Sequence, residues 1–582
     1  MNRRAFLGAG LAAGAVRLLR GAALDLRNSA ARVAPGLVVE RKWQGEFCHS
    51  RIVNRSDRAV RVREVVLFDV PHDLPGSTHL YGESFQMLSQ TAGTLAQPAD
   101  LGYNELKHYK IPQPDGVTAL SGLMTLTPPG GDTLAFAFTS CRRFQGRFYL
   151  RPGRFEVVVD TEGLDIGAGA AWDLEEFFFA TGARQAMLAR IGDAIAKNHP
   201  SPIFRPEPAG WCSWYCFGPR VTSQDVLANL DAIAKQIPAL KYVQIDDGYQ
   251  AAMGDWLVTG QAFGGDILGV LKEIRRRGFE PAIWVAPFIA EENSQVFREH
   301  PEWFLKDEAG KPLASNAVSF GGWRHGPWYA IDGTHPGAQK HLEDVFRTMR
   351  QDWGCTYFKM DANFWGALHG GRHYDSQATR VESYRRGMEA IRRGAGDAFL
   401  LGCNHPIWPS FGLIHGSRSS DDIKRTWAKI RGVARQTFYR NWQNGRLWWN
   451  DPDAICLAGD LPLNEFLFHA TACYASGGMA LSGDDLSKIA VDRLAILKKL
   501  APPTGIAAEF EDDSLRVGWI RTAGARRVCV FNWGESSERM AVRLPGKCHI
   551  TDFWSGDDLG RHEREFVIED LPPHSARLLE VK

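Results

Sequence analysis

The sequence predicts an α/β fold: a (β/α)8 TIM barrel, preceded by an N-terminal β-sandwich and followed by a small C-terminal antiparallel β domain. Three changes of pattern along the chain support this division. Residues 31–200 carry short apolar or alternating runs, residues 205–500 alternate apolar runs with helical stretches, and residues 505–582 return to β alternation. A chain of 582 residues is too long for one hydrophobic core, so several domains are expected.

Residues 1–30 predict an export signal. Paired arginines at positions 3 and 4 precede a mildly apolar, glycine-rich stretch that is too short to span a bilayer. This arrangement resembles a bacterial twin-arginine signal, which exports proteins that are already folded. We therefore expect an exported protein, periplasmic or extracellular, with no membrane partner. The ten cysteines show no CxxC pair and no zinc spacing, so free thiols are expected.

The first predicted domain, residues 31–200, reads as an antiparallel sandwich because its β signals have no helical interludes. A helical pattern and a proline-rich connector, "HPSPIFRPEPAG", then mark its end. The runs that predict its strands are "AVRVREVVLFDV", "DTLAFAFTS", "RFEVVVDTEG" and "EEFFFATG".

The second predicted domain, residues 205–500, has eight apolar runs separated mostly by helical stretches, which fits a (β/α)8 barrel. One helix is predicted by a capping pattern from Thr222 to Asp225, and another opens with Pro336. The eight predicted strands are "GWCSWYCF", "KYVQIDDGYQ", "EPAIWVAPF", "TYFKMDAN", "AFLLGCNHP", "GSRSSDDI", "RLWWNDPD" and "MALSGDD".

Composition narrows the possible partners. The 68 Lys+Arg and 67 Asp+Glu residues almost cancel, which gives no electrostatic case for nucleic acid or an acidic membrane. Of the 19 tryptophans, 14 fall between Trp211 and Trp449. This concentration favours either a site that uses flat apolar faces or ordinary core packing.

Polar side chains follow the predicted barrel strands at the end where active sites of such barrels lie. Uncompensated buried charges are costly, so five strands that end in charges indicate a site. Lys359 and Asp361 point the same way with period two, so the lysine can hold the aspartate ionised. The strand-end residues are Asp246, Asp247, Lys359, Asp361, Cys403, Asn404, His405, Arg418, Asp422, Asp451 and Asp453.

This set of carboxylates, one lysine, one arginine and many tryptophans favours glycoside cleavage. In that chemistry one carboxylate attacks the anomeric carbon while another protonates the departing oxygen. The sequence has no nucleophile–histidine pair, P-loop or dinucleotide fingerprint, and we expect no cofactor and no metal.

Five motifs in barrel order resemble glycoside hydrolase family 36, the α-galactosidases, and its clan relative family 27. They are "GWCSWY", "QIDDGY", "YFKMDAN", the Arg-x-x-x-Asp run from Arg418 to Asp422, and "WWNDPD". The resemblance covers residues 205–490. It implies a retaining, exo-acting α-glycosidase that removes terminal α-linked galactose from an oligosaccharide or glycoconjugate.

The same resemblance implies the roles of individual residues. Asp361 would be the nucleophile and Asp422 the acid/base, with a raised pKa; Asp422 is preferred to Asp421 because the family spaces its acid four residues after the arginine. Retention requires two carboxylates about 5 Å apart. The predicted substrate-binding residues are Asp246 and Asp247 for O4 and O6, Lys359 for O3 and O4, Arg418 for O2, Trp214 for the apolar face, and Trp284, Cys403 and Asn404.

The loop "CNHPIWPSFG" departs from the family, which usually has Ser-Gly-Gly after the cysteine. The resemblance places this loop near the sugar C2 substituent. The bulk of Ile407, Trp408 and Phe411 predicts a pocket closed to an acetamido group, which favours galactose over N-acetylgalactosamine. α-Glucosides are expected to be poor substrates because their equatorial O4 would miss the acceptor.

Several alternatives stay open. The same scaffold could serve an α-N-acetylgalactosaminidase or an α-galactosyl transferase. Asp246, Asp247, Asp361 and His405 could instead bind a divalent metal, although Lys359 would repel it, and a non-catalytic sugar-binding barrel is a further alternative. The segment "HGGRHYD", residues 369–375, is interpreted as a substrate-side loop rather than a ligand cluster.

Overall fold

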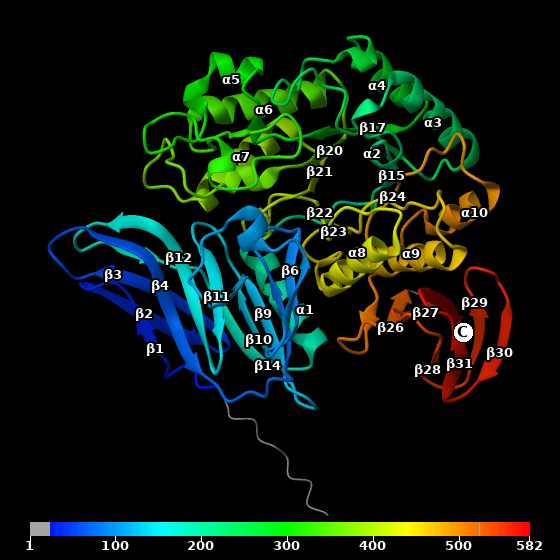
Figure 1. Cartoon of the computed structure of the whole chain (residues 1–582), viewed down its shortest axis with the longest axis horizontal. Helices are drawn as coiled ribbons and strands as arrows, with labels where there is room; N and C mark the ends of the chain where they lie inside the picture. The colour runs from blue at the N-terminus through cyan, green and yellow to red at the C-terminus, as the bar shows by residue number, and fades with distance from the viewer. Residues whose placement is uncertain (1–23, 523) are drawn as a thin grey trace, which may run out of the picture.

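The computed structural model describes residues 24–522 and 524–582; most of the predicted export signal lies outside these residues. Figure 1 shows a β-rich N-terminal part in blue and cyan, a barrel in green to orange, and a β-rich C-terminal part in red. The predicted α/β class and barrel architecture are therefore confirmed. No described helix is long and apolar enough to cross a membrane.

The N-terminal part consists of two antiparallel sheets. Its core contains apolar residues from both sheets, such as Phe68, Phe136 and Val157, none of which is exposed. One sheet has the order β1 (Ala30–Arg32), β4 (Val60–Pro71), β12 (Arg154–Ile166), β11 (Gln145–Arg151) and β8 (Thr118–Ser121). The other runs β13 (Ala171–Asp173), β3 (Phe47–Asn54), β14 (Phe177–Gly182), β10 (Thr133–Phe138), β9 (Leu123–Thr127), β5 (His79–Glu83), β6 (Ser89–Thr94) and β7 (Pro98–Gly102), with β2 (Leu37–Gln44) on β3.

The barrel is a parallel eight-stranded sheet whose first and last strands in the chain are neighbours. Its hydrogen-bonded strand path runs from β23 to β24, and an isolated bridge between Ile455 and Ser482 lies between these two ends. In chain order the strands are β15 (Ala209–Cys212), β16 (Tyr242–Ile245), β17 (Glu280–Val285), β20 (Tyr357–Met360), β21 (Phe399–Gly402), β22 (Gly416–Arg418), β23 (Trp449–Asp451) and β24 (Ala480–Ser482).

Helices surround this sheet, and their starts follow the caps in the sequence. Helix α3 begins after Thr222, whose side chain forms the predicted capping box with Asp225. Pro336 occupies the first position of α6, where its missing N–H is harmless. The main helices around the barrel are α3 (Ser223–Gln236), α4 (Ile267–Arg276), α6 (Pro336–Gln351), α7 (Arg380–Ala395), α8 (Trp427–Tyr439), α9 (Leu463–Ser476) and α10 (Val491–Leu500), whereas α1 (Arg184–Asn198) packs on β10 and β14 of the N-terminal part.

The run "GWCSWYCF" is shorter as a strand than its composition predicts. Strand β15 ends at Cys212, and residues Trp214–Phe217 form a helical turn, α2. This turn places Trp214 beside Asp246 and Asp361 in a cavity at the carboxyl ends of the barrel strands.

The C-terminal part is antiparallel and has its own apolar cluster, which includes Val528, Ile550 and Leu579. All ten cysteines lie within the described residues, and none is disulfide-bonded. The larger C-terminal sheet runs β25 (Glu509–Phe510), β26 (Val517–Thr522), β27 (Ala525–Asn532), β32 (Ser575–Val581), β29 (Cys548–Asp552) and β30 (Asp558–His562), beside the pair β28 (Glu538–Arg543) and β31 (Glu565–Leu571).

The N-terminal sheets and the barrel share buried contacts. Arg440, which follows α8, pairs with Glu83 at the end of β5 at 2.6 Å, and both side chains are at most 1% exposed. Arg440 also donates to the carbonyl oxygens of Met87 and of Ser419, the residue after β22. This ion pair therefore connects the first domain to the loop that carries Asp422.

Candidate active site

A cavity of about 410 Å³ opens at the carboxyl ends of the barrel strands. It contains nine of the ten residues that the sequence predicts as catalytic or substrate-binding; Arg418 is the exception. Its lining consists of Leu88, Tyr103, His108, Tyr109, Trp214, Asp246, Asp247, Trp284, Phe320, Gly322, Trp323, Lys359, Asp361, Cys403, Asn404, Asp421 and Asp422.

Asp361 directly follows β20, and two donors fix its carboxylate. The backbone N–H of Ala362 donates to Oδ1 at 2.7 Å, and the indole Nε1–H of Trp284 donates to Oδ2 at 3.2 Å. Ala362 has a φ of +53°, the left-handed region that an alanine rarely adopts. Strain of this kind often occurs at functional sites, so the turn after β20 is consistent with a carboxylate held for chemistry.

Lys359, on β20, forms its ion pair with Asp246, which follows β16, so the pair spans β17 at the floor of the cavity. Its Nζ lies 2.9 Å from Asp246 Oδ2, and both side chains are almost fully buried. The same carboxylate oxygen accepts from Gln244 Nε2 at 2.6 Å. Burial alone would lower the pKa of Lys359, but Asp246 raises it well above its ordinary value, so the lysine is a fixed positive charge.

Asp247 has one oxygen occupied and one without a partner. Its Oδ1 accepts from Gln250 at 2.6 Å and from Arg324 at 2.7 Å. Its Oδ2 is buried and, among the described residues, has no hydrogen-bond partner. Burial raises the pKa of Asp247 to about 6 against the opposing charge of Arg324. A buried acceptor with no donor is costly, and a ligand hydroxyl at the cavity floor would satisfy it.

Arg418 lies behind Asp422, away from the cavity surface. Its side chain is 1% exposed, and Nη2 contacts Asp422 Oδ1 at 2.8 Å and Asp453 Oδ2 at 2.9 Å. Asp453 also accepts from the hydroxyl of Tyr215 and the backbone N–H of Ile423. Arg418 therefore positions two carboxylates, and its predicted contact with the O2 side of a sugar stays a prediction.

Both adjacent aspartates line the cavity, but Asp422 is the more exposed of the two. The Asp422 side chain is about half exposed, at 53%. Asp421 is 11% exposed, pairs with Lys429, and accepts at Oδ1 from the backbone N–H of Asp422 at 2.7 Å. These contacts make Asp421 a support for Asp422.

The two candidate catalytic carboxyls have opposite pKa shifts. Burial raises the pKa of Asp361; Lys359 opposes this shift, and the charge of Asp422 adds to it. The cavity walls around Asp422 desolvate its carboxyl and would raise its pKa, but Arg418 and Lys359 hold the pKa below its ordinary value. The predicted raised pKa of Asp422 is therefore wrong for this arrangement, because Arg418 lies 2.8 Å away.

Part of the cavity wall comes from the N-terminal domain, which the sequence did not predict. Tyr103 and His108 stack with ring centroids 4.3 Å apart, and His108 stacks on Phe320 of the barrel at 4.1 Å. Tyr103 is 36% exposed and Trp323 is 42% exposed. The only signal for this wall was the tryptophan concentration, which includes Trp323 but not the residues of the first domain.

Gln86 connects this wall to the barrel. Its Nε2 donates to the hydroxyl of Tyr109 at 2.6 Å and to Asn404 Oδ1. The backbone N–H of Met87 donates to the carbonyl of His405 at 3.0 Å. Asn404 has a φ of +44° and so depends on these contacts for its position.

The bulky residues after Asn404 do not line the cavity. Ile407, Trp408 and Phe411 are at most 3% exposed, and Trp408 Nε1 donates to the carbonyl of Phe138 in the N-terminal domain at 2.7 Å. The expectation that they close the C2 pocket is therefore wrong: their bulk fills the domain interface.

The four residues of the metal-binding alternative do not form one cluster. His405 is fully buried outside the cavity, between the hydroxyls of Ser410 and Ser417, each at 2.9 Å. Within residues 24–522 and 524–582, no group of three or more His, Cys, Asp or Glu could hold a metal ion.

The chain resembles known glycosidases in sequence and fold. Residues 225–388 match the family described as Melibiase. An A type blood α-D-galactosamine galactosaminidase from Flavonifractor plautii is 25% identical over 293 residues, which are 47% of this chain and 27% of that protein. The chain thus spans about a quarter of the length of the first curated relatives it matches.

Two solved structures share the fold. An α-galactosidase from Thermus thermophilus, solved with p-nitrophenyl α-D-galactopyranoside, has a TM-score of 0.64 and 23% identity, covering 83% of this chain and 98% of that one. An α-galactosidase from Lactobacillus brevis has a TM-score of 0.66 and 12% identity, covering 97% and 83%. The second match spans the barrel and nearly the full length of its flanking β regions.

Proposed function

We propose that the protein is a retaining, exo-acting α-glycosidase of the glycoside hydrolase family 36 type that removes terminal α-linked galactose from oligosaccharides or glycoconjugates. The observation that carries this proposal is that Asp361 and Asp422 face one cavity whose floor holds the unpartnered oxygen of Asp247. The cavity floor is formed by strand ends, which suits a terminal sugar. The Melibiase match over 225–388 includes Asp361 but not Asp422.

In the first step, an Asp361 oxygen forms a bond to the anomeric carbon as the glycosidic carbon–oxygen bond breaks. Asp422 gives its proton to the departing oxygen. In the second step, a water oxygen attacks the anomeric carbon, Asp422 takes the water proton, and the ester to Asp361 breaks. The two inversions leave the product with the α configuration.

These two reaction steps need Asp361 ionised and Asp422 protonated, whereas the pKa shifts of the two carboxyls favour the proton on Asp361. The two arrangements contain the same number of protons, so they have the same pH dependence. Trp284 Nε1–H and the Ala362 N–H stabilise the ionised form of Asp361. The reactive arrangement is reached when Asp422 turns from Arg418 to the departing oxygen and takes up the proton.

Sugar recognition would involve the floor of the cavity. Asp247 Oδ2 is open to a hydroxyl, and Asp246 with Lys359 presents an adjacent fixed pair of charges. The resemblance assigns these groups to O4, O6 and O3 of a galacto-configured ring, with Trp214 against the apolar face. A site of this kind discriminates by leaving its own buried groups unpaired when a hydroxyl is misplaced.

A second candidate is an α-N-acetylgalactosaminidase on the same scaffold. The residues expected to exclude a C2 acetamido group, Ile407, Trp408 and Phe411, lie outside the cavity. The C2 side of the proposed site then depends on Cys403, Asn404 and the N-terminal wall.

A substrate panel with product analysis tests both candidates. We expect p-nitrophenyl α-galactoside to be cleaved, with the α-anomer of galactose first in the proton NMR spectrum, and the α-glucoside to be poorer by about two orders of magnitude in kcat/KM. The α-N-acetylgalactosaminide decides between the two candidates. Release of the β-anomer first would contradict retention, and cleavage of the β-galactoside alone would contradict the proposed substrate class.

A further inference from the structure

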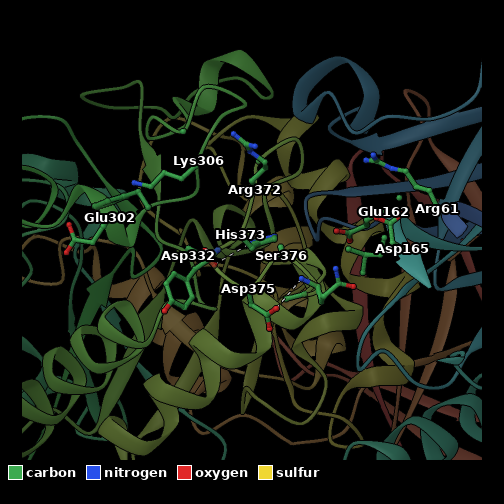
Figure 2. A pocket seen from close by; sticks show the side chains of 18 residues that line it. Arg61, Glu162, Asp165, Glu302, Lys306, Asp332, Arg372, His373, Asp375 and Ser376 are labelled. Atoms are coloured by element: carbon green, nitrogen blue, oxygen red, sulfur yellow. Dashed lines mark hydrogen bonds and ion pairs between the residues drawn. The ribbon is translucent and has the colours of Figure 1, made fainter. Parts of the chain in front are cut away.

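A second cavity, of about 700 Å³, lies between the N-terminal domain and the barrel. Figure 2 shows Arg61, Glu162 and Asp165 of the N-terminal domain on one side and Glu302 and Lys306 of a barrel loop on the other. Arg372, His373, Asp375 and Ser376 lie between them, on the loop that follows Asp361 in the chain. This loop includes the "HGGRHYD" motif, of which Gly371 to Asp375 line this cavity and none lines the catalytic one.

The cationic side chains of this cavity have carboxylates in their surroundings but, within the part of the chain that the structure describes, none in direct contact. Among the described residues, Arg61, Lys306 and Arg372 form no ion pair. Arg372 donates to the carbonyl oxygens of Asp307, at 3.0 Å from Nη2, and of Glu308, and Lys306 donates to the carbonyl of Pro301. These three residues therefore bring three positive charges to one cavity. Their hydrogen-bond partners among the described residues, where they have any, are backbone carbonyl oxygens.

Most of the acidic side chains that line this cavity already have hydrogen-bond or ion-pair partners. Glu162 accepts from the backbone N–H of Arg380 at 3.0 Å and lies 3.4 Å from its Nε, and Asp375 pairs with Arg386 at 2.8 Å. Asp165 and Glu302 lie at the edge: Asp165 is the cross-strand partner of Arg61, and Glu302, whose side chain is 55% exposed, contacts His300 Nδ1 through Oε1 at 3.2 Å. The cavity thus offers cations for an anionic group and two carboxylates that can accept from hydroxyls.

The loop on the barrel side is held in place by a buried carboxylate. Asp332, 2% exposed, accepts from the backbone N–H of Tyr374 at 2.6 Å and from His373 Nδ1 at 3.2 Å. A carboxylate can only accept, so Nδ1 carries the proton and Nε2 is left for a ligand. Tyr374 is 66% exposed, and its ring packs edge-on against His335 at 4.6 Å, which leaves an aromatic surface at the cavity.

The N-terminal side of this cavity contains an irregular strand. Strand β12 has a bulge between Asp160 and Leu164, and within it Glu162 adopts a φ of +59°. Bulges of this kind redirect a side chain and recur beside binding sites. Here the bulge turns Glu162 onto Arg380 and leaves Gly163 beneath the guanidinium of Arg61.

We propose that this second cavity binds an anionic sugar residue, one that carries a sulfate or carboxylate group, at a site separate from the catalytic cavity. Arg61, Lys306 and Arg372 would bind the anionic group, Asp165 and Glu302 the hydroxyls, and Tyr374 one face of the ring. The site would hold charged glycans to the enzyme. This proposal does not depend on which glycosidic bond the catalytic cavity cleaves.

Isothermal titration of the full chain at constant ionic strength tests the proposal. The probes are a chondroitin 4-sulfate tetrasaccharide, neutral chitotetraose and sodium sulfate. We expect the sulfated tetrasaccharide to bind one site and to bind about tenfold more weakly to Arg372→Ala and to Arg61→Ala, the ratio expected for one lost charge-assisted hydrogen bond. Arg564→Ala, which removes an exposed C-terminal arginine, is the matched control and should bind like the parent.

Turnover of an aryl α-galactoside should be the same in all three variants, which separates this site from the catalytic one. Sodium sulfate binding as tightly as the tetrasaccharide, and lost in the same variants, would support the anionic chemistry with a free ion as its source. Equal binding of chitotetraose would overturn the proposal. So would unchanged affinity in both cavity variants, or absence of any binding.

Discussion

The floor and the wall of the catalytic cavity are built in different ways. On the floor and beneath it, Lys359 pairs with Asp246 at 2.9 Å and Arg418 with Asp453 at 2.9 Å; all four side chains are buried, so these charges are fixed by other charges. The wall is a stack of aromatic rings, in which Tyr103 remains 36% exposed and no ion pair fixes its place.

This difference suggests a division of labour. Paired, buried charges cannot move without a large electrostatic cost, so the floor suits bond cleavage and recognition of one sugar configuration. Exposed aromatic faces tolerate many partners that present an apolar surface. We therefore expect floor substitutions to change kcat and wall substitutions to change the response to the aglycone.

The largest effect should follow loss of the nucleophile. Asp361→Asn keeps the shape of the side chain but cannot form the ester, and kcat should fall by about 10³-fold or more. The measurement is turnover of p-nitrophenyl α-galactoside, with circular dichroism to check folding. Restoration of activity by azide, which would give a β-galactosyl azide, would sharpen the assignment; near-normal turnover would contradict it.

Loss of the acid/base should depend on the leaving group. Asp422→Ala should reduce kcat/KM for an alkyl α-galactoside by about 10²- to 10⁴-fold, but far less for a nitrophenyl galactoside, which needs little protonation. The matched control is Asp421→Ala, which removes the neighbouring carboxylate that contacts Lys429. Equal losses on both substrates, or greater sensitivity at Asp421, would assign the role differently.

The contrast between floor and wall also explains what the sequence could predict. Floor residues such as Asp247 and Asp361 follow apolar runs directly, and strand periodicity places them at one end of a barrel. Tyr103 and His108 lie in a segment with no periodic signal, and only the packing of two domains brings them to the cavity. The fold and the floor were therefore accessible from local pattern, whereas the wall was not.

Two detailed expectations failed for the same reason. Ile407 and Trp408 were expected at the sugar, but burial against Phe138 stabilises them at the domain interface. The pKa of Asp422 was expected to be raised, but the contact with Arg418 lowers it. Neither the packing partner of an apolar loop nor the strength of a charge pair can be read from spacing along the chain.

The floor should also respond to pH through Asp247. Its pKa of about 6 lies above the usual value for an aspartate, so the carboxyl gains its charge as pH rises through this range. An ionised acceptor binds hydroxyls more strongly, so galactose should inhibit more tightly above pH 6 than at pH 5, by up to about tenfold. Inhibition constants measured against pH check this.

Asp247→Asn is the control for that measurement, because the amide cannot titrate. Its inhibition constant should be weaker than that of the parent at pH 7 and nearly constant from pH 5 to 7. A pH dependence that persists unchanged in Asp247→Asn would assign the titration to another group, such as Asp451, whose pKa is also raised by burial to about 6.

The smallest effect is expected at the wall. If Tyr103 contacts the aglycone, Tyr103→Ala should lower kcat/KM for a p-nitrophenyl or sugar aglycone by about threefold to tenfold, the ratio that one aromatic contact supplies. Methyl α-galactoside, which has almost no aglycone, should be unaffected. Tyr103→Phe keeps the ring that stacks on His108 and should behave like the parent. An equal loss on both substrates would mean that Tyr103 positions the floor, through Tyr109 and Asn404, and the two regions would then act as one.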